Sequence, residues 1–294
     1  MHDLRLTTFL TVCRHMNFTR AAAELNLTQP AVSQHIRFLE QHYGVKLFRY
    51  HGKKPVLTAE GEYLKTMAEA LTHDAARIRE NIGQIGNRRR FYLGATLSIG
   101  EFFLPDRLSA FLRRHSDTDI SVTVADTAAL LPLLDGGKLD CLLCEGYFNK
   151  KEYSHMLIRR ERMCIFAGAG HSTAHIRSLQ DLFGETLLLR EEGSGTREIF
   201  ERFLRENNYS LANFPRIHTF SSPHLILRML LDGMGISVLY EAVGEAQLKT
   251  GALKEILLPG FAVSHEFNAV WKKGSVFGRE YEALLRDLLG EKEQ

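Results

Sequence analysis

Three short segments in the C-terminal two thirds of the chain have the composition of an anion-binding site. They are Ser98-Ile99-Gly100-Glu101, Glu192-Gly193-Ser194-Gly195-Thr196-Arg197 and Ser221-Ser222-Pro223. A helix that begins at such a segment presents free backbone N–H groups, a hydroxyl and the positive end of its dipole. The first segment also has the Ser-x-x-Glu pattern of a capping box. If the three segments meet in space they favour an anionic ligand, although each serine could equally serve only as a helix cap.

The four cysteines predict no disulfide or metal site. Cys13, Cys141, Cys144 and Cys164 are few and irregularly spaced. Cys141 and Cys144 form a C-x-x-C pattern, but their apolar run predicts a buried strand, on which residues three apart point to opposite faces. That orientation is wrong for chelation or a disulfide. We therefore expect packed core thiols in a reduced, cytoplasmic protein with no metal and no cofactor.

The charge of the chain divides it into a basic N-terminal part and a near-neutral remainder. Among 294 residues with a net charge of +2, residues 1–90 hold 14 Lys/Arg and 8 Asp/Glu, whereas residues 91–294 hold 23 and 27. This asymmetry indicates a basic module that meets a polyanion. The N-terminus has no export-signal pattern, and no window reaches the roughly 18 apolar residues of a membrane span, so no membrane partner is expected.

The basic part has the pattern of three helices. Residues 3–15 predict an amphipathic helix, with Leu6, Phe9, Leu10 and Cys13 on its apolar face. Thr19 is expected to cap a short alanine-rich helix whose small side chains allow a close helix crossing. A tight turn at Asn26-Leu27-Thr28 follows, with Thr28 as the cap of the third helix and Pro30 in its first turn.

The third helix has two predicted faces. Its apolar stripe, which holds it to the module, consists of Val32, Ile36, Leu39 and Tyr43. Its opposite face carries polar groups near the N-terminus and a basic group one turn later, and consists of Gln29, Pro30, Ser33, Gln34 and Arg37. A recognition helix has this arrangement, because its first residues meet base edges and its basic groups meet phosphate. A solvated helix face is the alternative.

A β-hairpin wing is predicted after the third helix. Gly44 is placed to end that helix, and residues 45–58 predict two short strands around a Gly-Lys-Lys tip. Arg49, Lys53 and Lys54 are expected to contact the DNA backbone, which adds affinity that depends on salt and not on base sequence.

These residues together resemble the N-terminal domain of the LysR family of transcriptional regulators. The matching pattern is Phe18-Thr19-x-Ala21-Ala22-x-x-Leu25-x-x-Thr28-Gln29-Pro30-Ala31-Val32-Ser33, then Leu39-Glu40, Gly44-Val45-x-Leu47-Phe48 and Leu57-Thr58-x-x-Gly61. The resemblance implies a homodimer or homotetramer that binds double-stranded DNA, with the residues at Gln29, Pro30, Ser33 and Arg37 in the major groove. RNA polymerase is a further candidate partner.

A heptad pattern after Thr58 predicts a long helix that pairs with a second copy of itself. Leu64, Leu71, Ile78 and Ile85 are seven residues apart. The segment resembles the linker helix of the family, and a helix packed on its own domain is the alternative. We therefore divide the chain into a winged helix-turn-helix domain (1–58), a linker helix (59–89) and an effector-binding domain (90–294).

The last two hundred residues alternate between strand and helix patterns, which predicts a doubly wound α/β architecture. The candidate strands are Phe91–Ala95, Ile120–Val124, Cys141–Cys144, Cys164–Ala167, Leu187–Arg190, Ile236–Leu239 and Phe267–Trp271, and the candidate helices include Leu104–Arg114, Ile199–Asn207 and Tyr281–Leu289. This part resembles the periplasmic-binding-protein-like effector domain of the family. The expected lobe I covers about 90–163 and 267–294, and lobe II about 164–266.

Residues 189–198 and 99–105 resemble the branch of CysL-like regulators of sulfur and carbon assimilation. That resemblance implies effector contacts at Ser98, Glu145, Ser194, Thr196 and Ser222, to which we add Ile99 and His224. His224 could supply a pH-dependent charge, or it could be an ordinary surface histidine.

The predicted function is that of a DNA-binding transcriptional regulator controlled by a small anionic metabolite held between two lobes. An enzyme is the first alternative, but the chain has no nucleophile elbow, no metal-ligand spacing and no phosphate-loop consensus. A ligand sensor that has lost DNA recognition is the second alternative, and the complete set of recognition-helix and wing residues argues against it.

Overall fold

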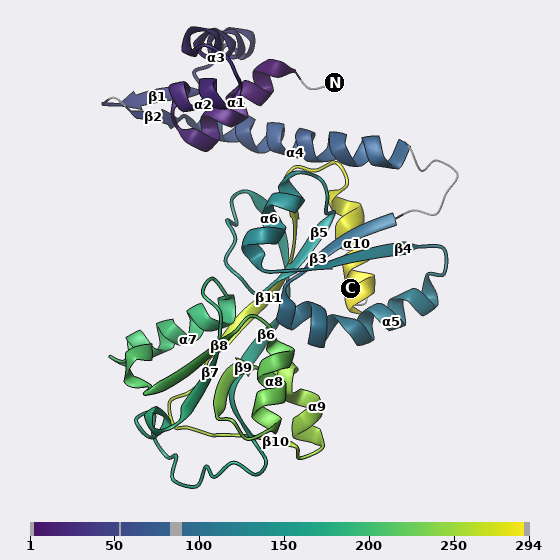
Figure 1. Cartoon of the computed structure of the whole chain (residues 1–294). Coiled ribbons are helices and arrows are strands. Elements are labelled where there is room, and N and C mark those ends of the chain that lie inside the picture. The colour runs from purple at the N-terminus through teal and green to yellow at the C-terminus, as the bar shows by residue number, and fades with distance from the viewer. Residues whose placement is uncertain (1–2, 53, 83–89, 291–294) are drawn as a thin grey trace.

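The computed structural model describes residues 3–52, 54–82 and 90–290. Figure 1 shows three parts: a small N-terminal domain, the long helix α4 beneath it, and two α/β lobes that follow one another away from α4. Lobe I lies against α4 and lobe II lies farther from it. Lys53 and Ile85, which the sequence places in the wing tip and the heptad pattern, lie outside the described residues.

The N-terminal domain is a three-helix unit with a hairpin. It comprises α1 (Leu4–His15), α2 (Phe18–Glu24), α3 (Gln29–Tyr43), β1 (Phe48–His51) and β2 (Lys54–Leu57). The prediction that Thr19 caps α2 is wrong. The side chain of Asn17 accepts hydrogen bonds from the backbone N–H groups of Thr19 and Arg20, since asparagine at this position reaches two donors of the first turn. Thr28 caps α3 as predicted, with its Oγ1 atom accepting from Ala31 N at 3.3 Å.

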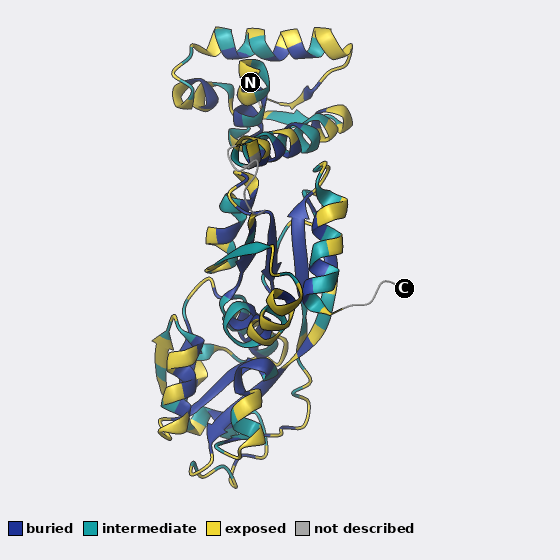
Figure 2. Cartoon of the chain, turned by 90° about the vertical axis from the view of Figure 1, so that its right-hand side faces the viewer, coloured by how far each residue is buried: buried dark blue, intermediate teal, exposed yellow. Residues whose placement is uncertain are grey.

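The core of this domain fixes which face of α3 is free. Val32, Ile36 and Leu39 are buried against residues of α1, α2 and β1. Tyr43, the fourth residue of the predicted stripe, is 47% exposed, because α3 ends there and Gly44 (φ +69°) turns the chain away. Exposed residues lie along α3, which forms the outer end of the molecule in Figure 2.

The effector part forms one continuous sheet shared by two lobes. Its elements are β3 (Arg90–Ala95), η1 (Ile99–Phe103), α5 (Leu104–Arg114), β4 (Asp119–Val124), α6 (Thr127–Asp135), β5 (Cys141–Cys144), β6 (Tyr153–Gly168), η2 (Asp181–Gly184), β7 (Thr186–Arg190), α7 (Gly195–Glu206), η3 (Leu211–Asn213), β8 (Arg216–Phe220), α8 (Pro223–Leu231), β9 (Ile236–Tyr240), α9 (Glu241–Lys249), β10 (Leu253–Glu255), β11 (Ser264–Lys272) and α10 (Gly278–Leu289). The strand order is β4-β3-β5-β11-β6-β9-β7-β8, with β10 paired to β6.

The long strand β6 carries the chain from lobe I to lobe II. Its residues 153–162 pair antiparallel with β11 in lobe I, and its residues 163–167 pair with β9 in lobe II. The other lobe I strands pair as β4-β3-β5, and the other lobe II strands as β9-β7-β8. The sequence pattern located only the apolar end of β6, at Cys164–Ala167, and it did not locate β8 or β10.

The C-x-x-C cysteines are core residues, as the alternation along a strand predicts. Cys141 is buried among the core residues shared by the two lobes, whereas Cys144 is buried in a separate cluster with Leu130, Leu134 and Val270. The two thiols therefore lie on opposite faces of β5. All four cysteines are free and buried, and burial raises the thiol pKa of Cys13 and of Cys164 to about 12.

Candidate DNA-binding and effector-binding sites

The predicted DNA-facing residues of α3 lie together on its free face. Gln29, Pro30, Gln34 and Arg37 are exposed, and Ser33 is half-buried. Gln29 Nε2 donates to Ser33 Oγ at 2.8 Å, one helical turn along. His35 lies to one side, where its Nδ1 atom is 2.9 Å from the Thr8 hydroxyl of α1. The helix therefore offers an exposed and largely polar face with one guanidinium to a neighbouring molecule.

The wing is held to α3 by a glutamate whose role the sequence pattern did not reveal. Glu40 Oε1 accepts a hydrogen bond from Leu47 N at 3.0 Å, and its Oε2 lies 2.7 Å from Lys46 Nζ. This carboxylate fixes the strand β1 relative to the recognition helix. Arg49 and Lys54 are exposed on the hairpin, where both can reach a polyanion.

The helix α4 (Ala59–Ile82) carries an exposed apolar stripe. Leu71 and Ile78 from the predicted heptad seam are 58% and 46% exposed, and Ile82 is also exposed. Leu64 differs from them, since it is partly buried against the core of the N-terminal domain. In the described part of the seam, Leu64 therefore packs within the chain, whereas Leu71 and Ile78 are exposed to solvent.

The first of the three serine segments does not form the predicted capping box. Ser98 has helical φ and ψ angles and makes no side-chain cap, because the helical turn already begins before it and Gly100 N donates to Thr96 O at 2.7 Å. Ile99 is fully buried in the core, so its side chain is unable to contact a ligand without repacking. Ser98 is buried beside Glu145 and donates to that carboxyl group.

Glu145 is a buried carboxyl group at the end of β5. Thr96 also donates its hydroxyl to Glu145, so two hydroxyls from the β3–η1 connection meet one carboxyl group. Burial raises the pKa of Glu145 to about 7, against the lowering effect of a backbone hydrogen bond, the Arg190 guanidinium and Ser98. The group therefore changes charge near neutral pH.

The second segment brings lobe II against the Glu145 region. Ser194 is the residue before α7 and its side chain makes no cap hydrogen bond. A side chain on Gly195 would come within 3.4 Å of the Cα atom of Gly146 in lobe I. Thr196 is 1% exposed, and its hydroxyl is buried without a hydrogen-bond partner in the described structure. A bound polar group could supply the missing hydrogen-bond partner of this hydroxyl at the helix N-terminus.

The third segment combines a helix cap with a contact between lobes. Ser222 Oγ accepts from Leu225 N at 3.3 Å, so its side chain serves as the N-cap of α8. His224 Nδ1 lies 2.6 Å from Glu101 Oε2, and the His224 ring stacks on Phe102 with ring centroids 4.4 Å apart. The segments that the sequence singled out therefore meet at two places where lobe II touches lobe I.

Further polar groups of this region were not expected from the sequence. Arg190 is buried at the end of β7 and pairs with Glu191 through two hydrogen bonds of 2.8 Å. The Tyr240 hydroxyl and the Asn268 Oδ1 atom are buried without hydrogen-bond partners in the described structure. Each of these residues is a single polar residue in an apolar strand. The local sequence pattern therefore does not mark it as a site residue.

Two other site classes find no support in the part of the chain that the structure describes. It contains no group of three or more His, Cys, Asp or Glu side chains arranged to hold a metal ion. It also contains no helix with the length and apolar character needed to cross a bilayer.

A winged helix-turn-helix joined to a two-lobed α/β domain defines a DNA-binding regulator with an effector-binding domain. Family models agree with this class. "Bacterial regulatory helix-turn-helix protein, lysR family" matches residues 4–62, and "LysR substrate binding domain" matches residues 84–292. The chain belongs to the LysR family of transcriptional regulators.

Curated relatives support the same conclusion. The RuBisCO operon transcriptional regulator of Allochromatium vinosum is 30% identical over 273 residues, which are 92% of this chain and 89% of the relative. The regulator CysL of Bacillus subtilis is 29% identical over 242 residues, which are 81% of this chain and 80% of the relative. These relatives carry the names of regulators, which agrees with the expectation that the chain is not an enzyme.

Solved structures share the fold. CrgA, a LysR-type transcriptional regulator from Neisseria meningitidis, matches with a TM-score of 0.57 and 21% identity, over 99% of both chains. The CcmR regulatory domain of Synechocystis PCC6803, solved in complex with 2-PG, matches with a TM-score of 0.60 and 18% identity, over 68% of this chain and 96% of that domain.

Proposed function

We propose that this regulator binds a small anion between its two lobes and that the bound anion changes its affinity for DNA. The recognition residues are Thr28, Gln29, Pro30, Ser33, Gln34 and Arg37, with Arg49, Lys53 and Lys54 of the wing on the DNA backbone. The regulator acts in the cytoplasm as a homo-oligomer joined through the exposed stripe of α4.

The observation that carries the effector half of this proposal is the Thr196 hydroxyl. It is buried, unpaired and located in the first turn of α7, where backbone N–H groups and the helix dipole favour negative charge. Ser98 donates to Glu145, and Ser194 directly precedes Gly195, which lies against Gly146 at the same junction between lobes. His224 belongs to the second contact, where it joins α8 to lobe I, and Ser222 caps α8 beside it. Ile99 contributes its backbone alone, since its side chain belongs to the core.

The names of the relatives suggest the metabolic context of the effector. Relatives include regulators of RuBisCO operons and CysL. We infer that this chain belongs to the branch that governs carbon or sulfur assimilation and that its effector is an anion of that metabolism.

The test is a thermal-shift and calorimetric screen of the full-length protein with 2-PG, inorganic phosphate, sulfate and neutral glycerol. We expect at least one anion to raise the Tm of the wild type and not that of Thr196→Val. Thr250→Val, which removes an exposed hydroxyl that donates to Gln247 O, is the matched control and should respond as the wild type does. Equal binding by Thr196→Val would show that the anion site lies elsewhere, and a response to glycerol alone would show that the ligand is not an anion.

A further inference from the structure

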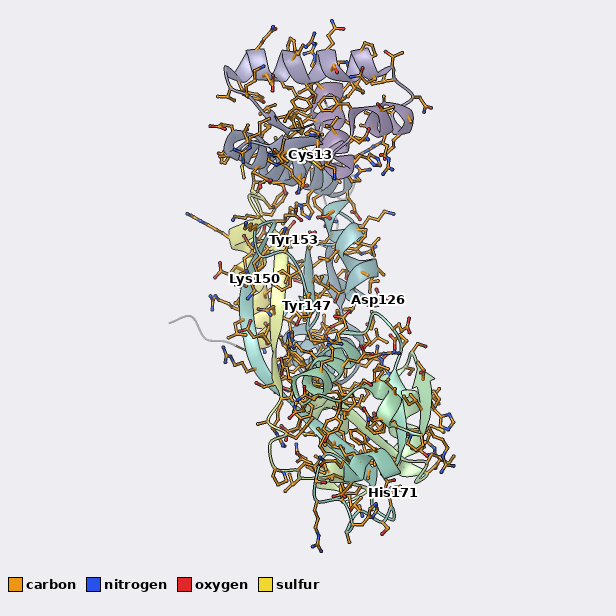
Figure 3. The ribbon with its side chains drawn as sticks, turned by 90° about the vertical axis from the view of Figure 1, so that its left-hand side faces the viewer. Cys13, Asp126, Tyr147, Lys150, Tyr153 and His171 are labelled. Atoms are coloured by element: carbon orange, nitrogen blue, oxygen red, sulfur yellow. The ribbon has the colours of Figure 1, made fainter. Side chains whose placement is uncertain are left out.

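The face of α4 opposite its apolar stripe docks on lobe I of the same chain through charged side chains. Figure 1 shows α4 lying across the end of lobe I, beside α6 and the loop that precedes α10, and Figure 3 places Tyr153 at that end of the lobe. The buried titratable groups of this contact include His73, Asp74 and Arg77 from α4, and Asp140 and Lys272 from lobe I.

The ion pair between Arg77 and Asp140 lies at the centre of the contact. Both residues are at most 3% exposed. Arg77 Nη2 donates to Asp140 Oδ2 at 3.1 Å, and Arg77 Nε lies 2.7 Å from Asp140 Oδ1. The same Oδ2 atom accepts from Tyr92 N at 2.8 Å, which anchors the carboxylate to β3. A buried charge without its partner is costly, so this pair fixes α4 in one register on the lobe.

Two further α4 residues bind backbone groups of lobe I. His73 Nε2 lies 3.1 Å from the carbonyl oxygen of Leu139, directly before Asp140. Asp74 accepts from the Ser275 hydroxyl at 2.6 Å and from Val276 N at 2.8 Å, in the loop after β11. These hydrogen bonds fix α4 at one position along the lobe I backbone. An apolar contact alone would not fix that position.

Lysines complete the contact at its other end. Lys272 Nζ donates to Glu69 of α4 at 2.8 Å and to Asp135 of α6 at 2.9 Å. Lys65 of α4 donates to Glu152 of lobe I at 2.6 Å. Charged groups therefore join α4 to lobe I along three turns of the helix.

Two glycines allow the loops of lobe I to approach α4. Gly137 has φ +66°, and a Cβ atom there would lie 2.7 Å from the His73 carbonyl oxygen and 2.8 Å from the Ala76 Cβ atom. Gly274 has φ +82°, and a Cβ atom there would lie 2.6 Å from the end of the Met67 side chain. Gly137 thus fits a rigid backbone contact that no larger residue could make without moving the helix.

The docked residues are connected to the junction between lobes by single strands. Asp140 directly precedes β5, and Glu145 directly follows it. Lys272 ends β11, the strand that also carries the buried Asn268. The strand β5 is fully buried and joins Glu145 at one end to Asp140, the partner of Arg77, at the other.

We propose that α4 and lobe I move as one body and that β5 conveys the state of the inter-lobe site to the helix that carries the DNA-binding domain. This inference rests on the proposed function for its regulatory meaning. The rigid contact itself does not depend on any ligand. In this arrangement one face of α4 responds to the effector domain while the other face is free to pair with a second copy.

Hydrogen–deuterium exchange on the ligand-free, full-length protein tests the contact. We expect Gly137→Ala to accelerate exchange of the α4 amides about 10-fold, because the new methyl group separates helix and lobe. Gly251→Ala is the matched control: Gly251 has φ +72° with open space around it, so it introduces the same backbone strain without a clash. Equal effects of the two variants, or none from Gly137→Ala, would overturn the inference.

A milder variant keeps the test decisive if Gly137→Ala fails to fold. Glu69→Gln removes one of the two carboxylates on Lys272 and should accelerate the exchange of α4 by a smaller factor, with that of lobe II unchanged. Unchanged exchange of α4 in this variant would count against the contact.

The transmission along β5 is tested by Glu145→Gln, which changes the other end of the strand. We expect this substitution to alter α4 exchange in the wild-type background and not in the Gly137→Ala background, where helix and lobe are separated. If it leaves α4 exchange unchanged in the wild type, the proposed transmission is wrong. Failure of the proposed function would appear separately, as loss of preference for upstream DNA in a binding assay.

Discussion

His224 in the first turn of α8 and Glu101 in η1 join lobe II to lobe I, with 2.6 Å between Nδ1 and Oε2. The same histidine stacks on Phe102, so one side chain makes both a polar and an aromatic contact across the junction. His224 is 60% exposed and Glu101 is 27% exposed, which leaves the pair open to solvent and salt. The pair is therefore a modest contact that holds lobe II to lobe I in the arrangement described.

Removing this contact should weaken effector binding slightly. Exposed ion pairs contribute about 0.2–1 kcal/mol, so we expect His224→Ala and Glu101→Gln each to lower the affinity for the anion about 1.5–5-fold. Calorimetry on both single variants and the double variant measures the coupling. His175→Ala, at an exposed pair with Glu185 in lobe II, is the control. Losses that simply add in the double variant would show that the two residues act independently.

Thr196→Val should stabilise the free protein while it weakens effector binding. Valine has nearly the same shape as threonine and lacks the hydroxyl that is buried without a partner, a group that costs about 1–3 kcal/mol. We expect urea unfolding to show a gain of about 1 kcal/mol in the free energy of unfolding. A loss of stability would mean that the hydroxyl is hydrogen-bonded in solution.

Glu145 should make stability depend on pH in a direction opposite to that of most carboxyl groups. Its pKa rises from 4.5 to about 7 on folding, so between these values the folded chain holds a proton that the unfolded chain releases. The free energy of unfolding therefore falls as pH rises through this window, by about 3 kcal/mol at most. Urea unfolding from pH 5 to 8 should show this slope in the wild type and not in Glu145→Gln; parallel profiles would contradict it.

The same group should make anion binding weaker at high pH. An anion placed near Glu145 disfavours its ionised form, so affinity should fall as the pH rises past about 7. Calorimetry with the anion that responds best in the screen measures this dependence. Glu145→Gln carries no charge at any pH and should bind with nearly constant affinity across the same range.

The exposed stripe of α4 predicts the oligomeric state. Leu71→Glu and Ile78→Glu place charges where a second copy would pack, and light scattering coupled to gel filtration should show loss of the oligomer. Leu257→Glu changes a leucine in lobe II that is even more exposed than Leu71, and it should leave the mass unchanged. An oligomer that survives both α4 substitutions would place its interface elsewhere.

Local patterns in the sequence identified much of the fold. The turn and cap at Thr28 located α3, and apolar runs located β3, β5, β7 and β9. The strand β8 (Arg216–Phe220) was missed because exposed polar residues alternate along it, and the first half of β6 was missed because of its arginines. The strand β8 lies at the edge of the sheet, and β6 crosses from one lobe to the other. Neither β8 nor the first half of β6 has an apolar run that would identify it as a strand.

Contacts between distant residues could not be predicted from the same patterns. Asn17 and Thr19 are both good caps, and the backbone angles before α2 decide between them. Arg77 and Asp140 are 63 residues apart, and each alone is typical of a charged surface residue. The composition also did not distinguish Ser222, which caps a helix, from Ser98, which does not.

Binding of the full-length protein to its own promoter-upstream DNA, followed by fluorescence anisotropy across a salt series, tests the central claim most directly. We predict a clear preference over a shuffled duplex, affinity that falls with salt, and a loss of about 1–3 kcal/mol for Arg37→Ala with effector binding unchanged. Equal affinity of the folded wild type for both duplexes, or an Arg37→Ala variant that binds as well as the wild type, would contradict the assignment of α3 as the recognition helix.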